Sequence, residues 1–339
     1  MEYTHTKCGK FNLDSVFMNA SGVKCKTTID LRNLYKTKVR TGAIVCKSTT
    51  LDYRRGNPGT IYYHSDSLKM SINSSGLPNY GYNFYIDMGL ELNKLAESKK
   101  YRYLYTVKKP YIMSVSGMTI EDNVEIITKI IEKHESNHIS GIELNLSCPN
   151  IIGKPQVGYD FEAFDETLRR VFELDLPKKI NMGLKLPPYF DISHYNSAFE
   201  IINKYPIDTL TCINSIGNGL VVDPINECSV ISPKKGLGGI GGSPIKSIAL
   251  ANVFQFSQNT KCDVIGCGGI SSGIDVFEHI LCGAKAVQLG TIVMIEGLDV
   301  FKKIERELLQ IMRNKKYKKI SDFCGKLKYC DTTFLNYNC

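Results

Sequence analysis

The sequence lacks the features of a membrane or secreted protein. No stretch approaches the ~20 consecutive apolar residues that a transmembrane helix needs. The first residues, MEYTHTKCGKFNLDS, contain no apolar segment typical of a secretory signal, and they do not resemble an Arg- and Ser-rich transit peptide. We therefore expect a cytoplasmic protein that does not associate with a membrane.

Closely spaced cysteines are also absent. None of the 12 cysteines forms a CxxC pair, and residues such as Cys8, Cys25 and Cys46 are isolated in the chain. In a protein without a secretory signal such cysteines are expected to be reduced thiols. Because structural zinc sites are built from closely spaced Cys and His ligands, we expect no metal site.

Charge is present in excess of one sign, but it is not spread evenly. The formal net charge is +8, and much of it lies in residues 312–328, MRNKKYKKISDFCGKLK, beside an amphipathic helical pattern at residues 301–312. A nucleic-acid partner is one interpretation of such a basic balance. A solvated helix end explains the same residues, and an anionic substrate or a phosphate-bearing cofactor would also suit a positive surplus. We expect no nucleic-acid partner.

Eight short β-rich apolar runs alternate with longer helical patterns, which indicates an α/β protein. The runs lie at residues 15–20, 42–48, 111–117, 141–147, 180–186, 207–215, 262–269 and 284–291. The helical patterns lie at residues 121–135, 161–174, 193–205, 244–258 and 272–283. Thr119 and the pair Ser271–Ser272 precede two of these patterns as helix-start residues.

This alternation fits a (β/α)8 TIM barrel or a doubly wound open sheet, and the ends of the runs favour the barrel. Polar, reactive or glycine residues follow nearly every run, and a barrel brings all eight strand ends to one mouth. We predict a single barrel domain over residues 1–339. Insertions at about residues 49–110 and at 221–242 are expected to lie over the mouth, and a short tail is expected at about residues 329–339.

Glycine-rich segments follow the last two runs. They are GCGGISSG at residues 266–273 and LGT at residues 289–291. Glycines let backbone N–H groups approach an anion, and the helix that begins at SSGID (271–275) is expected to add its positive end. In barrels the loops after strands 7 and 8 are a frequent phosphate site. Tight turns alone would explain the same glycines. The GLGGIGG run at residues 236–242 lacks the strand–helix context of a dinucleotide fingerprint, so we expect a flexible loop that brings amides to the same phosphate.

Two lysines and several amides also follow predicted strands. Lys47 and Lys185 are flanked by apolar residues, where a cation is costly to bury unless it faces an anion. Either lysine could instead extend to solvent. Amides and hydroxyls converging on one mouth suit a planar ligand with alternating donors and acceptors, such as a nucleobase. These residues are Asn73, Ser74, Asn145, Asn150, Asn214 and Ser215.

Cys148 is the leading candidate for a general base. No paired carboxylates and no His dyad follow the predicted strands. A thiol with an ordinary pKa of about 8.5 can be tuned to lose its proton near neutrality. Burial is the usual explanation of an isolated cysteine, but Cys148 is followed by a proline and by Asn150 on a loop at the mouth. Glu143 lies inside its strand, so we expect it to be a structural partner for a buried cation.

Taken together, the motifs resemble those of the class 1A dihydroorotate dehydrogenases, over about residues 11–328. The resemblance is carried by FMNASGV (17–23), CKS (46–48), RRGNP (54–58), INSSGLPN (72–79), ELNLSCPN (143–150), GKPQ (153–156), GLKLPPYFD (183–191), NSIGNG (214–219), GLGGIGG (236–242), GCGGI (266–270) and LGT (289–291). Two places depart from the family pattern: Gly59-Thr60-Ile61 follows RRGNP, and Ser75 stands where Met is usual.

The resemblance implies an FMN-dependent (β/α)8 barrel that oxidises dihydroorotate to orotate in pyrimidine synthesis, as a cytosolic homodimer that passes electrons to fumarate. It implies that Cys148 removes the C5 proton of dihydroorotate and that Lys47 contacts both flavin and substrate. The implied substrate residues are Lys47, Asn73, Gly76, Leu77, Asn145, Asn150, Asn214 and Ser215. The implied FMN residues are Ala20, Ser21, Gly22, Lys47, Ser48, Asn145, Lys185, Gly241, Gly242, Gly268, Gly269, Gly290 and Thr291.

Neighbouring classes remain as alternatives at this point. The membrane-linked class 2 uses Ser as base, so Cys148 favours class 1. A class 1B subunit would work with an NAD-linked iron–sulfur partner. A tRNA-dihydrouridine synthase also combines Cys and flavin in a barrel, but only about 48 residues follow LGT, too few for its RNA-binding domain. A barrel that only binds a ligand is a third alternative. The loop that follows Cys148, IIGKPQVGY, is expected to be a lid over the site.

Overall fold

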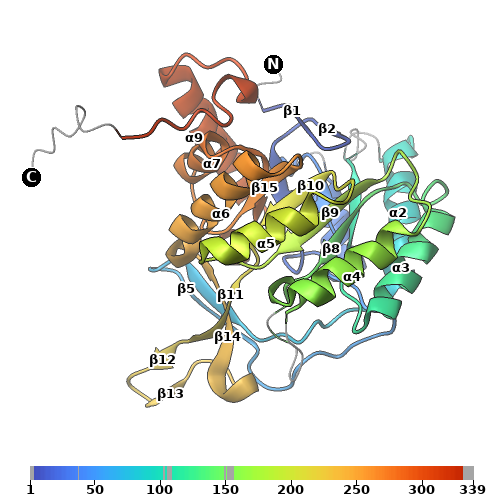
Figure 1. Ribbon diagram of the computed structural model, residues 1–339. Helices are drawn as coiled ribbons and strands as arrows, with labels where there is room; N and C mark the ends of the chain where they lie inside the picture. Colours follow the sequence, from blue (N-terminus) through green and yellow to red (C-terminus); the bar gives the residue numbers. More distant parts are fainter. Residues whose placement is uncertain are drawn as a thin grey trace, which may run out of the picture.

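The computed structural model describes residues 4–36, 38–101, 104, 109–148, 150 and 156–330 (Figure 1). Its centre is a sheet of eight parallel strands, in the spatial order β3-β16-β15-β10-β9-β8-β7-β4. A parallel bridge between Met18 and Ala43 joins the first and last of these strands and closes the sheet into a barrel. The strands are β3 (Phe17–Asn19), β4 (Ile44–Val45), β7 (Tyr111–Val115), β8 (Ile139–Asn145), β9 (Asn181–Leu186), β10 (Thr209–Cys212), β15 (Asp263–Cys267) and β16 (Ala284–Leu289).

Each barrel strand coincides with one of the eight apolar runs, so the predicted TIM barrel is confirmed. Helices follow the strands in the alternation that a (β/α)8 barrel requires. They are α1 (Thr28–Tyr35), α2 (Tyr82–Glu97), α3 (Ile120–Lys133), α4 (Phe161–Phe172), α5 (Ile192–Ile202), α6 (Lys246–Asn259), α7 (Gly273–Leu281), α8 (Thr291–Glu296) and α9 (Val300–Asn314). Short 3₁₀ turns lie at Val157–Tyr159, Pro233–Gly236, Ser243–Ile245 and Ile320–Asp322.

Two helix starts have the cap that the sequence predicts. The hydroxyl of Thr119 accepts a hydrogen bond from the N–H of Asp122 at 3.0 Å, and that of Ser272 accepts from Asp275 at 3.4 Å. These bonds satisfy N–H groups that have no partner within the helix. The amphipathic faces of the helices then pack on the outside of the strands and form the main hydrophobic core.

Helix α2 was not predicted, and it changes the extent of the first insertion. It lies within the segment 49–110, and its buried residues Tyr85, Ile86 and Leu92 follow helical spacing. Gly89 interrupts this apolar pattern. Glycine is required at this position because a Cβ there would lie 2.3 Å from the carbonyl oxygen of Asn137. Within the described residues of this segment, the part before α2 extends beyond the barrel, while α2 is the regular barrel helix between β4 and β7.

The inserted segments pair with each other in a four-stranded antiparallel sheet of order β11-β14-β6-β5. These strands are β5 (Tyr62–Ser65), β6 (Met70–Asn73), β11 (Ile216–Leu220) and β14 (Leu237–Gly242), and a small hairpin of β12 (Val222–Asp223) and β13 (Cys228–Ser229) extends from them. The glycine run at 236–242 is thus mostly strand, not the flexible loop we expected. Glycine is needed there because a Cβ on Gly238 would lie 2.6 Å from the carbonyl oxygen of Asn73.

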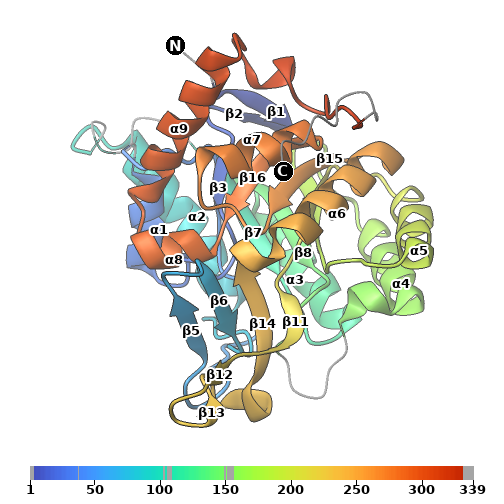
Figure 2. The same ribbon diagram turned by 90° about the vertical axis from the view of Figure 1, so that its left-hand side faces the viewer.

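The hairpin of β1 (Thr6–Cys8) and β2 (Phe11–Leu13) lies at the end of the barrel opposite this sheet (Figures 1 and 2). Its side chains join a small cluster of buried residues from inside the barrel, namely Cys8, Phe11, Leu13, Met18, Ala43, Val45, Ile112, Ile265 and Ala286. The N–H of Gly9, in the turn, donates to Asp263 at 2.7 Å. We call this apolar cluster the barrel base.

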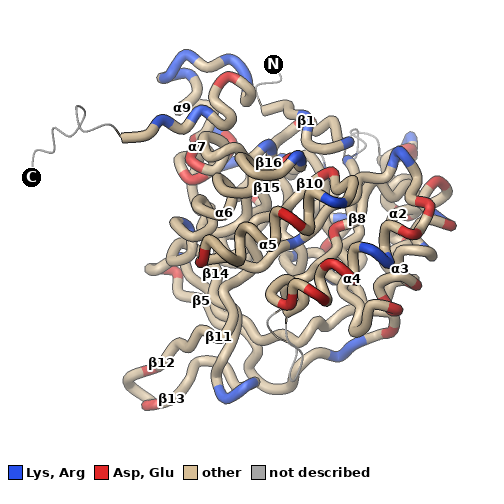
Figure 3. Tube along the Cα trace, viewed as in Figure 1, with Lys and Arg blue, Asp and Glu red and all other residues tan. Residues whose placement is uncertain are grey.

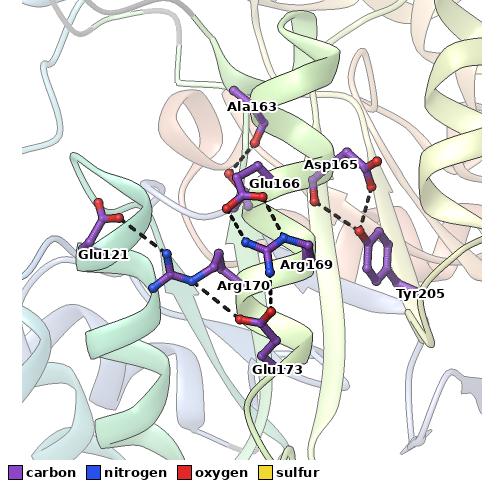
Figure 4. Close-up of polar contacts among 9 residues, drawn as sticks. Glu121, Ala163, Asp165, Glu166, Arg169, Arg170, Glu173 and Tyr205 are labelled. Carbon is purple, nitrogen blue, oxygen red and sulfur yellow. Dashed lines mark hydrogen bonds and ion pairs between the residues drawn. The ribbon is translucent and has the colours of Figure 1, made fainter.

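Charged side chains gather on the outer surface in two places. Lys and Arg mark the segment that follows α9 (Figure 3). On α4, Arg169 forms ion pairs with Glu166 and Glu173, and Arg170 lies 3.6 Å from Glu173 and 3.8 Å from Glu121 of α3 (Figure 4). Among the helices of the described residues, none is both long and apolar enough to span a membrane.

Candidate active site

A cavity of about 360 Å³ lies where the carboxyl ends of the barrel strands meet the inserted sheet. Its size is in the usual range for small-molecule sites. Every predicted site residue except Ser74 and Gly76 lines this cavity. The lining residues therefore include Ala20, Ser21, Gly22, Lys47, Ser48, Asn73, Leu77, Asn145, Cys148, Asn150, Lys185, Asn214, Ser215, Gly241, Gly242, Gly268, Gly269, Gly290 and Thr291. Their convergence was predicted, whereas their individual roles stay predictions.

Gly76 shapes the neighbouring loop and does not line the cavity. Its φ is +69°, in the left-handed region that glycine adopts without strain, and a Cβ would lie 2.3 Å from Oδ1 of Asn57. The side-chain amide of Asn57 donates to the carbonyl oxygens of Ser74 and Asn150, at 2.9 and 3.2 Å. Gly76 thus allows Asn57 to tie the inserted loop to the loop after β8.

Cys148 follows β8, whose inward residues become increasingly polar toward the mouth. Glu143 lies inside the barrel, Asn145 ends the strand, and Cys148 lines the cavity on a half-buried loop. The thiols of Cys25 and Cys46 are fully buried instead, and burial raises the pKa of both to about 12. They remain protonated at neutral pH. Cys267 also lines the cavity but is buried, so Cys148 is the better-exposed thiol at this mouth.

Four side-chain amides at the mouth form two connected groups. Asn150 donates to Oδ1 of Asn73 at 2.8 Å, which links the loop after β8 to the inserted sheet. Asn214 donates to the hydroxyl and carbonyl oxygens of Ser147, at 3.0 and 2.9 Å, and Ser147 in turn donates to Oδ1 of Asn145. The fully buried Ser147 was not predicted as a site residue, although its hydroxyl orients both amides.

One amide oxygen in these two groups accepts no hydrogen bond from the described residues. Oδ1 of Asn150 is buried and has no hydrogen-bond partner among the described residues. A buried acceptor without a donor is costly, so this atom suits a ligand N–H group.

The two predicted lysines reach the cavity in different ways. Among the residues that the structure describes, the ammonium group of Lys47 has no hydrogen-bond or carboxylate partner, and a Cβ on Gly22 would lie 3.3 Å from its Nζ. Lys185 is only 5% exposed, and its Nζ donates to Oε1 of Gln288 at 2.8 Å. Two cations beside one cavity favour an anionic ligand.

Glu143 does not contact either lysine directly, contrary to our expectation of a cation partner. Its Oε2 accepts hydrogen bonds from Thr211 at 2.9 Å and from Gln288 at 2.6 Å. Gln288 therefore lies between Glu143 and Lys185. The signal that could have identified Gln288 is a lone amide in the apolar run AKAVQLG, two residues before Gly290 and so on the same face of its strand.

Glycines at the ends of β14, β15 and β16 form an open cradle beside the cavity. Gly242, Gly268 and Gly269 have φ values of +89°, +130° and +75°, which residues other than glycine rarely adopt. A Cβ on Gly241 would lie 3.1 Å from the hydroxyl of Thr291. The positioning of these residues fits a phosphate group bound by backbone amides.

The start of α7 does not belong to this cradle, although we expected its positive end to face the phosphate. The N–H of Gly273 donates to Glu307 at 2.7 Å, and the N–H of Ser271 donates to Asp275 at 2.9 Å. These carboxylates occupy the N–H groups that an anion would use. Behind the cradle, Nε2 of the fully buried His279 donates to the carbonyl oxygen of Gly268 at 3.0 Å. Burial lowers the pKa of His279 to about 4.

Apolar and hydroxyl residues that the motifs did not indicate complete the wall. Ile61, Tyr62, Ser71 and Ser75 come from the first inserted segment, so the departures at Ile61 and Ser75 face the cavity itself. The loop containing Ile61 is tied to the second insertion, since the N–H of Ser232 donates to the carbonyl of Thr60 at 2.8 Å. The predicted lid and the GKPQ motif lie largely outside the described residues.

Comparison with known proteins agrees with this geometry. A family model described as dihydroorotate dehydrogenase matches residues 3–312. A Streptococcus equi protein named as a dihydroorotate dehydrogenase A (fumarate) is 45% identical over 331 residues, which cover 97% of this chain and 99% of that protein. A Kluyveromyces lactis dihydroorotate dehydrogenase (fumarate) is 45% identical over 324 residues, covering 95% and 96% of the two chains.

Solved structures show the same fold at much lower identity. The crystal structure of ligand-free DHODH from Eimeria tenella superposes with a TM-score of 0.78 at 15% identity, over 96% of this chain and 92% of that one. Its complex with ferulenol gives a TM-score of 0.77 at 16% identity, covering 95% and 88% of the chains. From the family match and the full-length relatives, we conclude that the chain belongs to the dihydroorotate dehydrogenase family.

Proposed function

We propose that the protein oxidises (S)-dihydroorotate to orotate in de novo pyrimidine biosynthesis, with FMN as cofactor and fumarate as electron acceptor. The observation that carries this proposal is one cavity that combines Cys148, two lysines and a ring of amides with a glycine cradle. The relatives named above support the choice of substrate and acceptor, because their names specify dihydroorotate dehydrogenase and fumarate.

The cavity fits FMN in two respects. Glycines with positive φ at the ends of β14 and β15, together with Gly290 and Thr291, would hold the phosphate by backbone N–H groups. Ala20, Ser21 and Gly22 offer small side chains to a flat ring, with Lys185 at the cavity floor. When bound, FMN would supply the acceptor for the hydride that leaves C6 of dihydroorotate.

The polar ring of the cavity suits the pyrimidine. The amides of Asn73, Asn145, Asn150 and Asn214, together with Ser215, would hold its donors and acceptors. Oδ1 of Asn150, which has no partner in the described part of the chain, would accept from a ring N–H. The ammonium group of Lys47, which has no partner among the described residues, would pair with the substrate carboxylate. Cys148 would act as the general base that removes the C5 proton, since this residue lines the same cavity.

Four parts of the prediction extend beyond the cavity. We propose a single FMN-binding domain, a homodimer, a cytoplasmic location and fumarate rather than an NAD-linked partner as acceptor. Exposed apolar residues that lie close together in the chain on the inserted arm, Leu220, Val222 and Ile225, are candidates for the contact between subunits, because contiguous exposed apolar patches mark protein–protein contacts.

Anaerobic titration of the purified protein tests the function. We expect a yellow protein with flavin absorbance near ~450 nm that is bleached by dihydroorotate and regains its colour with fumarate. A panel of fumarate, a quinone and NAD as acceptors separates the classes. Bleaching without recolouring by fumarate would show that the electron acceptor is not fumarate. A yellow protein that dihydroorotate does not bleach would refute the activity.

A further inference from the structure

A chain of buried polar side chains crosses the barrel beneath the cavity. Lys185 of β9 donates to Oε1 of Gln288 on β16 at 2.8 Å, and Nε2 of Gln288 donates to Oε2 of Glu143 on β8 at 2.6 Å. Thr211 of β10 donates to the same carboxylate oxygen at 2.9 Å. All four residues are at most 5% exposed, so solvent does not screen these contacts.

The chemistry of the two end groups determines how Gln288 is oriented. An ammonium group can only donate and an ionised carboxylate can only accept, so the amide must turn its carbonyl to Lys185 and its NH₂ to Glu143. Gln288 is neutral and therefore holds the ammonium group without cancelling its charge. Among the described residues, no carboxylate lies within ion-pair distance of Lys185.

Without Gln288, Lys185 and Glu143 would be free to approach each other. They lie on neighbouring strands that are paired in parallel, and Lys185 is in register with Asn145, one inward step above Glu143. The second carboxylate oxygen of Glu143, Oε1, is buried and has no hydrogen-bond partner among the described residues. A buried anion with an open acceptor attracts the nearest flexible cation strongly.

We propose that Gln288 is a positioning residue that keeps Lys185 on the cavity floor and apart from Glu143, so that the full positive charge of Lys185 acts on the bound flavin. The proposal rests on the flavin-binding function proposed above. A cation beside the flavin stabilises its reduced, more negative state. The position of Lys185 therefore raises the reduction potential of the cofactor. Gln288 acts through Lys185 and need not contact the substrate.

The test measures the flavin reduction potential by equilibration with a reference dye, not the rate of turnover. Gln288→Met has a similar side-chain length and removes both hydrogen bonds. We expect Lys185 to pair with Glu143 in this variant and the ratio of reduced to oxidised flavin at a fixed dye potential to fall on the order of tenfold. For a two-electron couple, this corresponds to about 30 mV toward lower potential.

Removing the anion in the same background should restore the potential. In Glu143→Gln/Gln288→Met no carboxylate remains to draw Lys185 away, so we expect a value close to that of the wild type. Glu143→Gln alone, which is close to isosteric, should shift the potential slightly upward. Asn181→Leu is the matched control, since it removes a buried amide from the other end of the Lys185 strand and should leave the potential unchanged.

The outcomes separate this proposal from the function on which it rests. A purely structural role of Gln288 would lower flavin occupancy or stability without the potential shift and without rescue by Glu143→Gln, which would overturn the proposal. If Gln288→Met does not fold, an unchanged or lowered potential in Glu143→Gln overturns it as well. A wild-type protein that dihydroorotate does not bleach would instead refute the proposed function.

Discussion

The two ends of the barrel interior are built from the same strands but differ in chemistry. At the barrel base, Val45, Ile112, Ile265 and Ala286 form an apolar plug with the β1–β2 hairpin. Two residues further along these strands, on the same inward face, the chain places Lys47, Ser114, Cys267 and Gln288. One inward step thus separates an apolar layer from a polar one.

This difference indicates that one end of the barrel interior contributes mainly to stability and the other mainly to function. The apolar base gains stability from burial and needs no partners. The polar layer near the mouth is also buried, so each of its groups requires a hydrogen-bond partner, and most have one, as Ser48 does with Ser114 at 2.9 Å. Three buried atoms that have no hydrogen-bond partner among the described residues, Oδ1 of Asn150, Oε1 of Glu143 and the hydroxyl of Tyr62, lie on residues that line the cavity.

The largest effect is expected at the mouth, from Cys148→Ser. A hydroxyl is a much weaker base than a thiolate, so flavin reduction by dihydroorotate should slow by about 10²–10⁴-fold, the usual contribution of a general base. Stopped-flow absorbance under anaerobic conditions gives this rate. Flavin content and unfolding midpoint should match the wild type, and an unchanged reduction rate would remove Cys148 as the base.

At the barrel base, Ile265→Ala should lower the stability of the protein and leave the rate of flavin reduction unchanged. Ile265 is 3% exposed within the apolar plug, and truncation leaves a cavity that the rigid strands cannot fill. The free energy of unfolding should fall by about 2–5 kcal/mol, as measured by urea denaturation. The reduction rate per bound flavin should remain that of the wild type; a lower rate with an unchanged unfolding curve would contradict the division between the two ends.

Behind the glycine cradle, His279 should make stability depend on pH. Burial holds its pKa near about 4 in the folded protein, below the ordinary value near 6.5. The unfolded state therefore binds a proton first as pH falls, and the folded protein should lose up to about 3 kcal/mol between pH ~6.5 and ~4.

His279→Gln tests this dependence, because a glutamine can still donate to the carbonyl of Gly268 but does not titrate. Urea denaturation across that pH range should show a flatter profile than the wild type. His64→Gln is the control, because His64 is an exposed residue of strand β5. A variant with the wild-type slope would show that other groups cause the loss.

The smallest effect is expected on the outer surface. Arg169 joins Glu166 and Glu173 in an ion-pair network on α4 (Figure 4), where solvent and salt screen the charges. Arg169→Ala should leave both the urea midpoint and the reduction rate within measurement error. A clear shift in the midpoint would mean that polar contacts outside the barrel contribute as much as those inside.

The sequence was sufficient to predict the barrel and most of the residues around its cavity. Buried parallel strands are continuous apolar runs, so each was visible, and its polar end could be placed at the mouth. Helix α2 was missed because Gly89 interrupts its apolar face and because the segment around it is rich in Tyr and Gly. The β14 strand was misread because its glycines reflect a close approach of Asn73, which only the paired structure reveals.

The polar contacts beneath the cavity could not be predicted for a different reason. Gln288 is one amide in an apolar strand and belongs to no motif, and its partners come from strands more than 100 residues away, as Lys185 does with a separation of 103. We predicted Gly76 at the cavity because it lies in the same motif as Leu77, INSSGLPN. Its positive φ turns it toward Asn57 instead.

The central claim is that residue 148 removes the C5 proton at the mouth of this barrel. It is tested most directly by the anaerobic bleaching rate of Cys148→Ser with dihydroorotate deuterated at C5 and with unlabelled dihydroorotate. Because proton removal should limit the rate in this variant, we expect the deuterated substrate to bleach the flavin more slowly. Equal rates for the two substrates, in a variant that is slower than the wild type, would contradict the claim.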